Sequence, residues 1–118
     1  MGRVKEGWRY FAEQATELPN VREMMHEWDR VVQFSLSGED PFYLTFSKGT
    51  VTISDGTHEK PDLTLEGPED VFYRLMTGEL DLMRAFMLEQ FKFDGALRDA
   101  ARFAEIGDAV RGSVKFPP

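Results

Sequence analysis

The residue types that most often carry acid–base or metal chemistry are few and scattered in this sequence. His26 and His58 are its two histidines, and a run of predicted strands separates them. That separation is not typical of a metal-ligand spacing. The chain has no cysteine, which excludes disulfides, thiol catalysis and thiolate metal ligands. We therefore expect no metal site and no catalytic role for either histidine.

Carboxylates occur in pairs, but each pair has a structural explanation. Glu39–Asp40 falls in a predicted turn, Glu69–Asp70 at a predicted helix start, and Glu79 with Asp81 beside a predicted helix cap. General acid–base catalysis needs a carboxyl group whose pKa is shifted by burial, and these positions favour water. No serine is flanked by the glycines of a nucleophile elbow, and no glycine-rich phosphate loop is present. The sequence predicts no enzyme and no cofactor.

The excess of acidic over basic residues limits the kinds of partner that the protein is expected to bind. There are 14 Lys and Arg against 21 Asp and Glu, which gives a net charge of −7. An acidic surface repels nucleic acid and anionic membranes, so we expect no nucleic-acid binding and at most transient membrane contact. The longest apolar run, Ala85–Leu88, is far shorter than the ~20 residues of a membrane span. With no secretory apolar run near the N-terminus, we expect a cytoplasmic protein of one domain, 118 residues long.

The first segment of the chain is predicted to be helical. Apolar residues recur at helical spacing from Val4 to Leu18, which predicts an amphipathic helix ended by Pro19. Asn20 followed by Glu23 resembles a capping pair and predicts the start of a second, short helix.

Three strands are predicted next, because the spacing of apolar residues changes from helical to alternating. They are centred on residues 32–36, 42–46 and 51–53, and Lys48–Gly49 suits a tight hairpin turn. Each strand has one apolar and one polar face. One face of this antiparallel meander is therefore expected to look to water, and helices are expected to cover the other. A polar loop then leads to a fourth strand at Leu63–Leu65.

The second half is predicted to combine three helices with one more strand. The first of these helices stops at Gly78, and Asp81 caps the next one. A fifth strand lies at 91–94. The last helix is expected to end or bend at Gly107, and the Val110–Pro118 tail is expected to wrap the surface.

Large apolar side chains are unusually frequent, with ten Phe and six Met. Many of them fall on predicted elements that face one side of the sheet. They could pack solidly, as protein interiors normally do, or they could line an apolar cavity with few polar anchors. Composition and spacing leave both alternatives open. The residues concerned are Phe72, Leu75, Met76, Leu80, Met83, Phe86, Met87, Phe91 and Phe103.

One segment carries a resemblance to a known family. Residues 78–87 read Gly-x-Leu-x-x-Met-Arg-Ala-Phe-Met, and Lys92–Gly95 follows as part of a short strand. This order of elements and residue types resembles the sterol carrier protein 2 lipid-transfer family from Asp62 to about Phe103. The resemblance implies an α+β fold, in which about five helices cover one face of a five-stranded, mainly antiparallel sheet.

The resemblance also implies a function. Members of this family carry a fatty acid, a fatty acyl-CoA or a similar lipid in an apolar tunnel between sheet and helices, and they are not catalysts. The nine apolar residues named above would line that tunnel, and those within residues 80–87 are matched by the motif itself. Arg22 and Arg30, at the predicted helix–strand junction, are the expected partners of a carboxylate head group.

An alternative from a different class stays open. An accessory or dimerisation module would keep the same fold with a filled core, and it would transfer no lipid. The partners expected besides a lipid are an enzyme of lipid metabolism and a second copy of the chain. Carrier and module differ in one physical respect, which is the presence of a void between sheet and helices.

Overall fold

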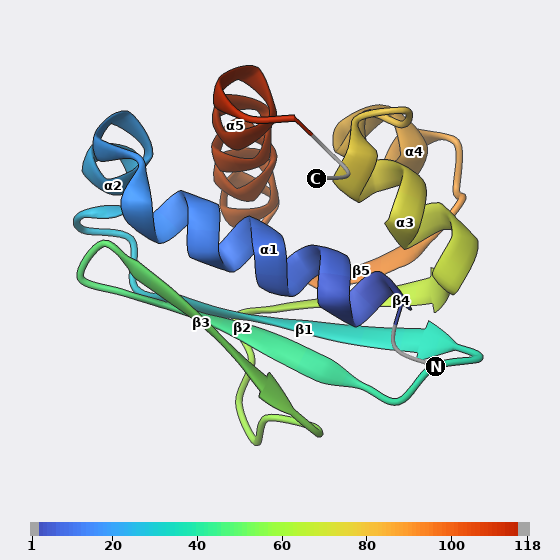
Figure 1. Ribbon diagram of the computed structural model, residues 1–118. Coiled ribbons are helices and arrows are strands. Elements are labelled where there is room, and N and C mark those ends of the chain that lie inside the picture. Colours follow the sequence, from blue (N-terminus) through green and yellow to red (C-terminus); the bar gives the residue numbers. More distant parts are fainter. Residues whose placement is uncertain (1–2, 116–118) are drawn as a thin grey trace.

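The computed structural model describes residues 3–115, which form a five-stranded sheet with five helices on one side of it (Figure 1). The strand order is β3-β2-β1-β4-β5. The helices are α1 (Arg3–Glu17), α2 (Pro19–Met25), α3 (Glu69–Thr77), α4 (Leu82–Met87) and α5 (Leu97–Ser113). The strands are β1 (Arg30–Ser37), β2 (Phe42–Ser47), β3 (Thr50–Asp55), β4 (Leu63–Pro68) and β5 (Lys92–Gly95). This architecture confirms the predicted α+β class.

The meander of β1, β2 and β3 is antiparallel, as predicted. Lys48 and Gly49 have φ values of 51° and 80°, and positive φ at both central residues is the geometry of a tight hairpin turn whose twist suits the strands. The alternation of apolar residues is confirmed as well. Val32, Phe34 and Leu36 all point to the helix side and are buried.

One pair of strands is parallel. β4 lies beside β1 in parallel, with Val32 opposite Leu63 and Ser37 opposite Pro68. The edge strand β5 then returns antiparallel to β4. The sheet is thus mostly antiparallel, and β1 lies at its centre, where it pairs with β2 on one side and β4 on the other.

One helix boundary differs from prediction in the first half of the chain, and one agrees in the second. Asn20 does not cap α2: the helix starts at Pro19, and Leu18 is the N-cap without a side-chain hydrogen bond. Proline fits the first turn of a helix because it needs no N–H partner there, so the start moves ahead of Asn20. Asp81 does cap α4, accepting a hydrogen bond from the Arg84 N–H at 3.0 Å.

The last helix is longer than predicted. α5 continues through Gly107 to Ser113, so of the two expected alternatives the end of the helix at Gly107 is wrong. Burial of Phe103, Ile106 and Val110 along one face holds the helix together across the glycine. The tail expected from Val110 is therefore helical as far as Ser113, and its last residues, 116–118, lie outside the described residues.

The face of the sheet away from the helices is not uniformly open to water. Gln33 of β1 points to that face and is only 3% exposed. Its side-chain amide donates to the carbonyls of Phe42 and Gly56, and its oxygen accepts from the His58 N–H at 2.7 Å. These bonds hold the β3–β4 loop beneath the sheet (Figure 1). The expectation of a water-facing surface fails at this position because a loop covers it.

Candidate functional site

A row of aromatic rings runs between the sheet and the helices. Trp8 of α1 lies 4.9 Å from Phe34 of β1 between ring centroids, and Phe34 lies 5.8 Å from Phe72 of α3. Phe72 lies 5.6 Å from Phe91, and Phe91 lies 6.2 Å from Phe86 of α4. Tilted and edge-to-face contacts of this kind are favourable. We call these five residues the aromatic row; it leads from α1 to the region of α4 and β5.

Four helices meet beside Trp8, at a void of about 10 Å³. We call this place the helix seam; it lies between α1, α3, α4 and α5. Its lining is apolar except for one arginine, and a void of this size holds about one water molecule at most. The residues of the helix seam are Trp8, Leu75, Leu82, Phe103, Ala104, Gly107 and Arg111.

At the other end of the aromatic row, an open groove of about 620 Å³ lies along α4 and β5. We call it the outer groove. Phe86 forms its centre, with Phe93 at 4.6 Å edge-to-face. Apolar side chains predominate, with a glutamate and a lysine among them. The lining residues are Phe86, Met87, Glu89, Phe91, Lys92 and Phe93.

The nine predicted wall residues are distributed between these two places and the core that joins them. Five are buried: Phe72, Leu75, Met76, Phe91 and Phe103. Leu80, Met83 and Phe86 are partly buried and pack against the core, whereas Met87 is 77% exposed beside the outer groove. The structure therefore brings most of the predicted residues together, but in a nearly filled interior rather than around an open tunnel.

The two predicted head-group arginines lie elsewhere. Arg22 is on the exposed side of α2. Arg30 forms an ion pair with Asp99, Nε to Oδ1 at 3.1 Å, and its guanidinium lies 5.9 Å from the Trp28 ring. The charge of Arg30 is thus already balanced within the protein. A head-group role for either residue stays a prediction.

Five residues of the helix seam were not predicted as site residues from the sequence: Trp8, Leu82, Ala104, Gly107 and Arg111. Leu82 lies within the family-like motif, so its position was a signal. Arg111 follows the mid-helix Gly107 by four residues, which places both on the same face of α5. That spacing was the signal that could have identified the arginine.

The two tryptophans differ in how their N–H groups are satisfied. Trp28 Nε1 donates to Asp99 Oδ1 at 3.2 Å. Trp8 is 2% exposed, and its Nε1 is buried without an acceptor among residues 3–115. Leaving a buried donor unpaired costs about 1–3 kcal/mol, so such groups call for an explanation. At Trp8 the unpaired group belongs to a ring that lines the helix seam.

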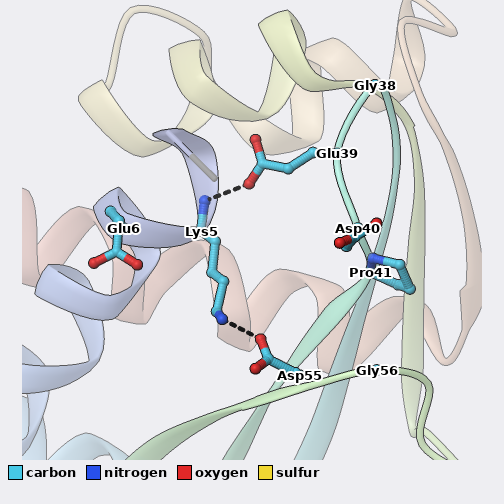
Figure 2. A pocket seen from close by; sticks show the side chains of 8 residues that line it. All are labelled: Lys5, Glu6, Gly38, Glu39, Asp40, Pro41, Asp55 and Gly56. Carbon is cyan, nitrogen blue, oxygen red and sulfur yellow. Dashed lines mark hydrogen bonds and ion pairs between the residues drawn. The ribbon is translucent and has the colours of Figure 1, made fainter. Parts of the chain in front are cut away.

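A wide polar hollow of about 960 Å³ lies at the start of α1 (Figure 2). The Glu39 carboxylate accepts hydrogen bonds from the backbone N–H groups of Val4 and Lys5, and so caps α1 from another part of the chain. The Lys5 ammonium pairs with Asp55, and this hydrogen bond with the accompanying charge attraction lowers the pKa of Asp55. These groups hold α1 against the sheet, which is a structural role.

Within residues 3–115, no three His, Cys, Asp or Glu side chains are grouped so as to hold a metal ion. None of the helices formed by these residues has both the length and the apolar character needed to cross a membrane.

Comparison with protein families decides the classification. The model of the SCP-2 sterol transfer family matches residues 11–108. The chain belongs to this family. The matched residues contain the whole sheet and most of the aromatic row, whereas Trp8 and Arg111 lie just outside them. Membership suggests lipid binding or transfer and leaves the ligand unspecified.

Solved structures share the fold of this SCP-2 family member. The apo sterol carrier protein 2 of Yarrowia lipolytica is 19% identical, with a TM-score of 0.69 over 91% of this chain and 88% of that one. The UbiJ-SCP2 ubiquinone synthesis protein is 15% identical, with a TM-score of 0.73 over 92% of each chain. At such identities the likeness establishes the fold alone. Comparison with curated protein sequences gives no match.

One match concerns part of a larger protein. The sec-alkylsulfatase Pisa1 from Pseudomonas sp. is 20% identical, with a TM-score of 0.64 over 72% of this chain. The matched segment makes up 14% of the sulfatase chain. The same fold thus occurs as a small portion of an enzyme.

Proposed function

We propose that the chain is a non-catalytic cytoplasmic carrier of a fatty acid, a fatty acyl-CoA or a similar lipid. The acyl chain would lie along the aromatic row, between the helices and the sheet. The observation that carries this proposal is the family match over residues 11–108. It is supported by the apolar interior that joins the helix seam to the outer groove.

Lipid binding requires a conformational change that enlarges the interior. The helix seam encloses only about 10 Å³, whereas ligand pockets usually enclose about 300–1,000 Å³. α4 is the element best suited to move. It has six residues, and only Leu82 and Ala85 among them are buried. Transfer of an acyl chain of ~16 carbons from water gains roughly 0.8 kcal/mol per methylene. That gain exceeds the roughly 1.5–3 kcal/mol needed to expose a buried leucine such as Leu82.

The direct test is native mass spectrometry of the protein as purified from cells, followed by organic extraction of any bound molecule. We expect a mass excess that resolves into acyl lipids. A second measurement uses the absence of cysteine: a fluorophore on Met87→Cys reports the environment of α4. Addition of palmitic acid is expected to change its emission. A bare mass that remains bare after incubation with fatty acid and acyl-CoA would refute the carrier.

A second candidate function is favoured by the small size of the void. An accessory module with a filled core needs no space for lipid, and the likeness to the UbiJ-SCP2 ubiquinone synthesis protein supports a role beside biosynthetic enzymes. A homodimer, or a complex with a lipid-metabolism enzyme, is the assembly expected then. Sedimentation of the purified chain and cross-linking in cells would detect either assembly.

Filling the interior distinguishes carrier from module. Met83 is partly buried on α4, so Met83→Trp adds bulk beneath the element that must move. For a carrier we expect loss of palmitate binding with little change in stability. Overpacking of a solid core would instead cost about 1–3 kcal/mol in chemical denaturation. Arg84→Trp is the matched control, because Arg84 is exposed on the same helix.

A further inference from the structure

The helix seam contains two polar groups whose placement the fold does not require. One is the buried N–H of Trp8, which has no acceptor among residues 3–115. The other is the guanidinium of Arg111, the single charged group in the lining. The rest of the seam offers no side-chain acceptor, since it consists of leucine, phenylalanine, alanine and glycine. A ring with an unpaired hydrogen-bond donor and an arginine therefore line one small, otherwise apolar space.

The position of Arg111 is built into the helices around it. A Cβ at Gly107 would lie 3.0 Å from Nη1 and 3.1 Å from Nη2 of the guanidinium, and a Cβ at Gly78 would lie 3.1 Å from Cδ. The side chain thus rests on two glycines, and it is only 16% exposed. Gly78 is explained independently by its φ of 87° at the end of α3. Gly107 lies inside α5, where glycine is unfavourable, and the guanidinium explains it.

The ion pair that Arg111 makes leaves it able to bind a second acid. Its Nη2 donates to Asp108 Oδ1 at 2.8 Å, within the same helix. Asp108 is 66% exposed, so water can replace Arg111 as its partner. A guanidinium carries five N–H donors, and it binds carboxylates through two of them at once.

We propose that the helix seam binds the carboxylate end of a long-chain carboxylic acid. Arg111 pairs with the carboxylate, one of whose oxygens accepts the Trp8 N–H, and the acyl chain runs along the aromatic row. The inference rests on the proposed function and names its ligand class: a free acid rather than an ester, an alcohol or a sterol.

The test compares two probes that differ only at the head group, palmitic acid and methyl palmitate, by competition against a fluorescent lipid. The wild type is expected to bind the acid about tenfold more tightly, as is typical of a charge-assisted hydrogen bond. Arg111→Gln should bring the two affinities together by weakening the acid alone. The matched control is Arg102→Gln, since Arg102 pairs with Glu105 three residues along the same helix and is 45% exposed.

A structural defect in a variant would weaken the binding of both probes equally. The ratio of the two affinities therefore distinguishes a loss of head-group recognition from a folding defect. Equal affinity of the wild type for acid and ester would overturn the head-group assignment and leave the carrier intact. An unchanged ratio of acid to ester affinity in Arg111→Gln would overturn the assignment as well. So would a loss of the acid preference in Arg22→Gln or Arg30→Gln instead. Binding of neither probe would overturn the inference together with the proposed function.

Trp8 is tested without a variant, by the indole N–H signals of the ¹⁵N-labelled protein. Palmitic acid is expected to move the Trp8 signal downfield and to slow its exchange with solvent, whereas methyl palmitate moves it less. The signal of Trp28 serves as the internal control, because the Trp28 N–H already donates to Asp99. A Trp8 signal that is unchanged by the acid and shows a cross-peak to bound water identifies a buried water only, and overturns its role.

Discussion

Gly107 illustrates how a single missing methyl group determines where a charge lies. In the interior of an exposed helix, Gly→Ala normally adds up to about 1 kcal/mol of stability. At Gly107 the new methyl group would meet the Arg111 guanidinium at 3.0 Å, so the arginine must move away. We expect Gly107→Ala to gain less stability than this, and to reduce the preference for palmitic acid over its methyl ester.

Gly112 provides the comparison for that substitution. It also lies on α5, and a Cβ there would meet nothing within 4 Å. Gly112→Ala, one residue before the end of α5, should therefore gain part of this helix stabilisation and leave the ligand preference unchanged. Thermal unfolding and the two-probe competition, performed on both variants, measure the difference. Identical behaviour of the two variants would contradict the role assigned to Gly107.

For single residues, the sequence predicts burial correctly where the apolar character of the side chain is enough to determine it. The clustering of Phe72, Phe91 and Phe103 in the interior follows from their apolar surface. Gln33 and Arg111 could not be placed in this way. Their positions depend on a loop and on a helix that approach from elsewhere in the chain, and local spacing carries no information about such contacts.

Among the elements, α4 is the one whose stability the proposed carrier function ties most closely to binding. Its N-terminus is held by the Asp81 carboxylate, which accepts the Arg84 N–H. Asp81→Ala is expected to cost about 0.5–2 kcal/mol of helix stability. Because the proposed function requires α4 to move when a lipid enters, we also expect faster hydrogen exchange in residues 82–88 and a faster association rate for palmitic acid.

Asp70→Ala is the matched control for this change of charge. Asp70 lies in the first turn of α3 and makes a surface pair with Arg74 at 3.8 Å. Surface pairs of this kind contribute little. An association rate raised equally by both substitutions would point to electrostatic repulsion rather than to the opening of α4.

The attachment of α1 to the sheet gives a prediction about pH. The hydrogen bond from Lys5, with its charge, lowers the pKa of Asp55 in the folded protein (Figure 2). The stabilisation is therefore present above the unfolded-state pKa of about 3.9 and is lost as the pH falls through the lower folded-state value. Wild type should exceed Asp55→Asn in melting temperature at pH 6; the difference should begin to shrink near pH 4, the approximate unfolded-state pKa, and should vanish only below the lowered folded-state pKa of Asp55. A difference that persists unchanged at low pH would contradict this account.

Prediction of whole elements succeeded where their signals are local. The hairpin at Lys48–Gly49 and the cap at Asp81 depend on neighbouring residues, and both are confirmed. The continuation of α5 through Gly107 was missed because packing against the core overrides the weak helix propensity of glycine. The pairing of β1 with β4 joins distant segments, so local patterns did not reveal that it is parallel.

For the whole molecule, net charge determines how a ligand would reach a membrane. With a charge of −7, the protein is repelled by anionic vesicles at low salt. We expect transfer of a fluorescent fatty acid to proceed through water, at a rate set by release from the protein. The rate should not change with vesicle concentration or with the fraction of anionic lipid. A rate that rises with vesicle concentration would instead indicate transfer by collision, and repetition at high salt would identify its electrostatic part.

The helix seam joins the two ends of the described chain, since Trp8 comes from α1 and Phe103 from α5. Ribosomal synthesis produces Trp8 nearly a hundred residues before Phe103. During that interval the nascent chain carries an uncovered tryptophan and an incomplete hydrophobic layer over β1. Synthesis that stops before α5 yields a chain whose Trp8 and Phe34 lack Phe103, the ring that packs against both. Such fragments would expose these apolar rings to chaperones and proteases. Quality control of the nascent chain and the proposed ligand binding would then depend on the same residues of the helix seam.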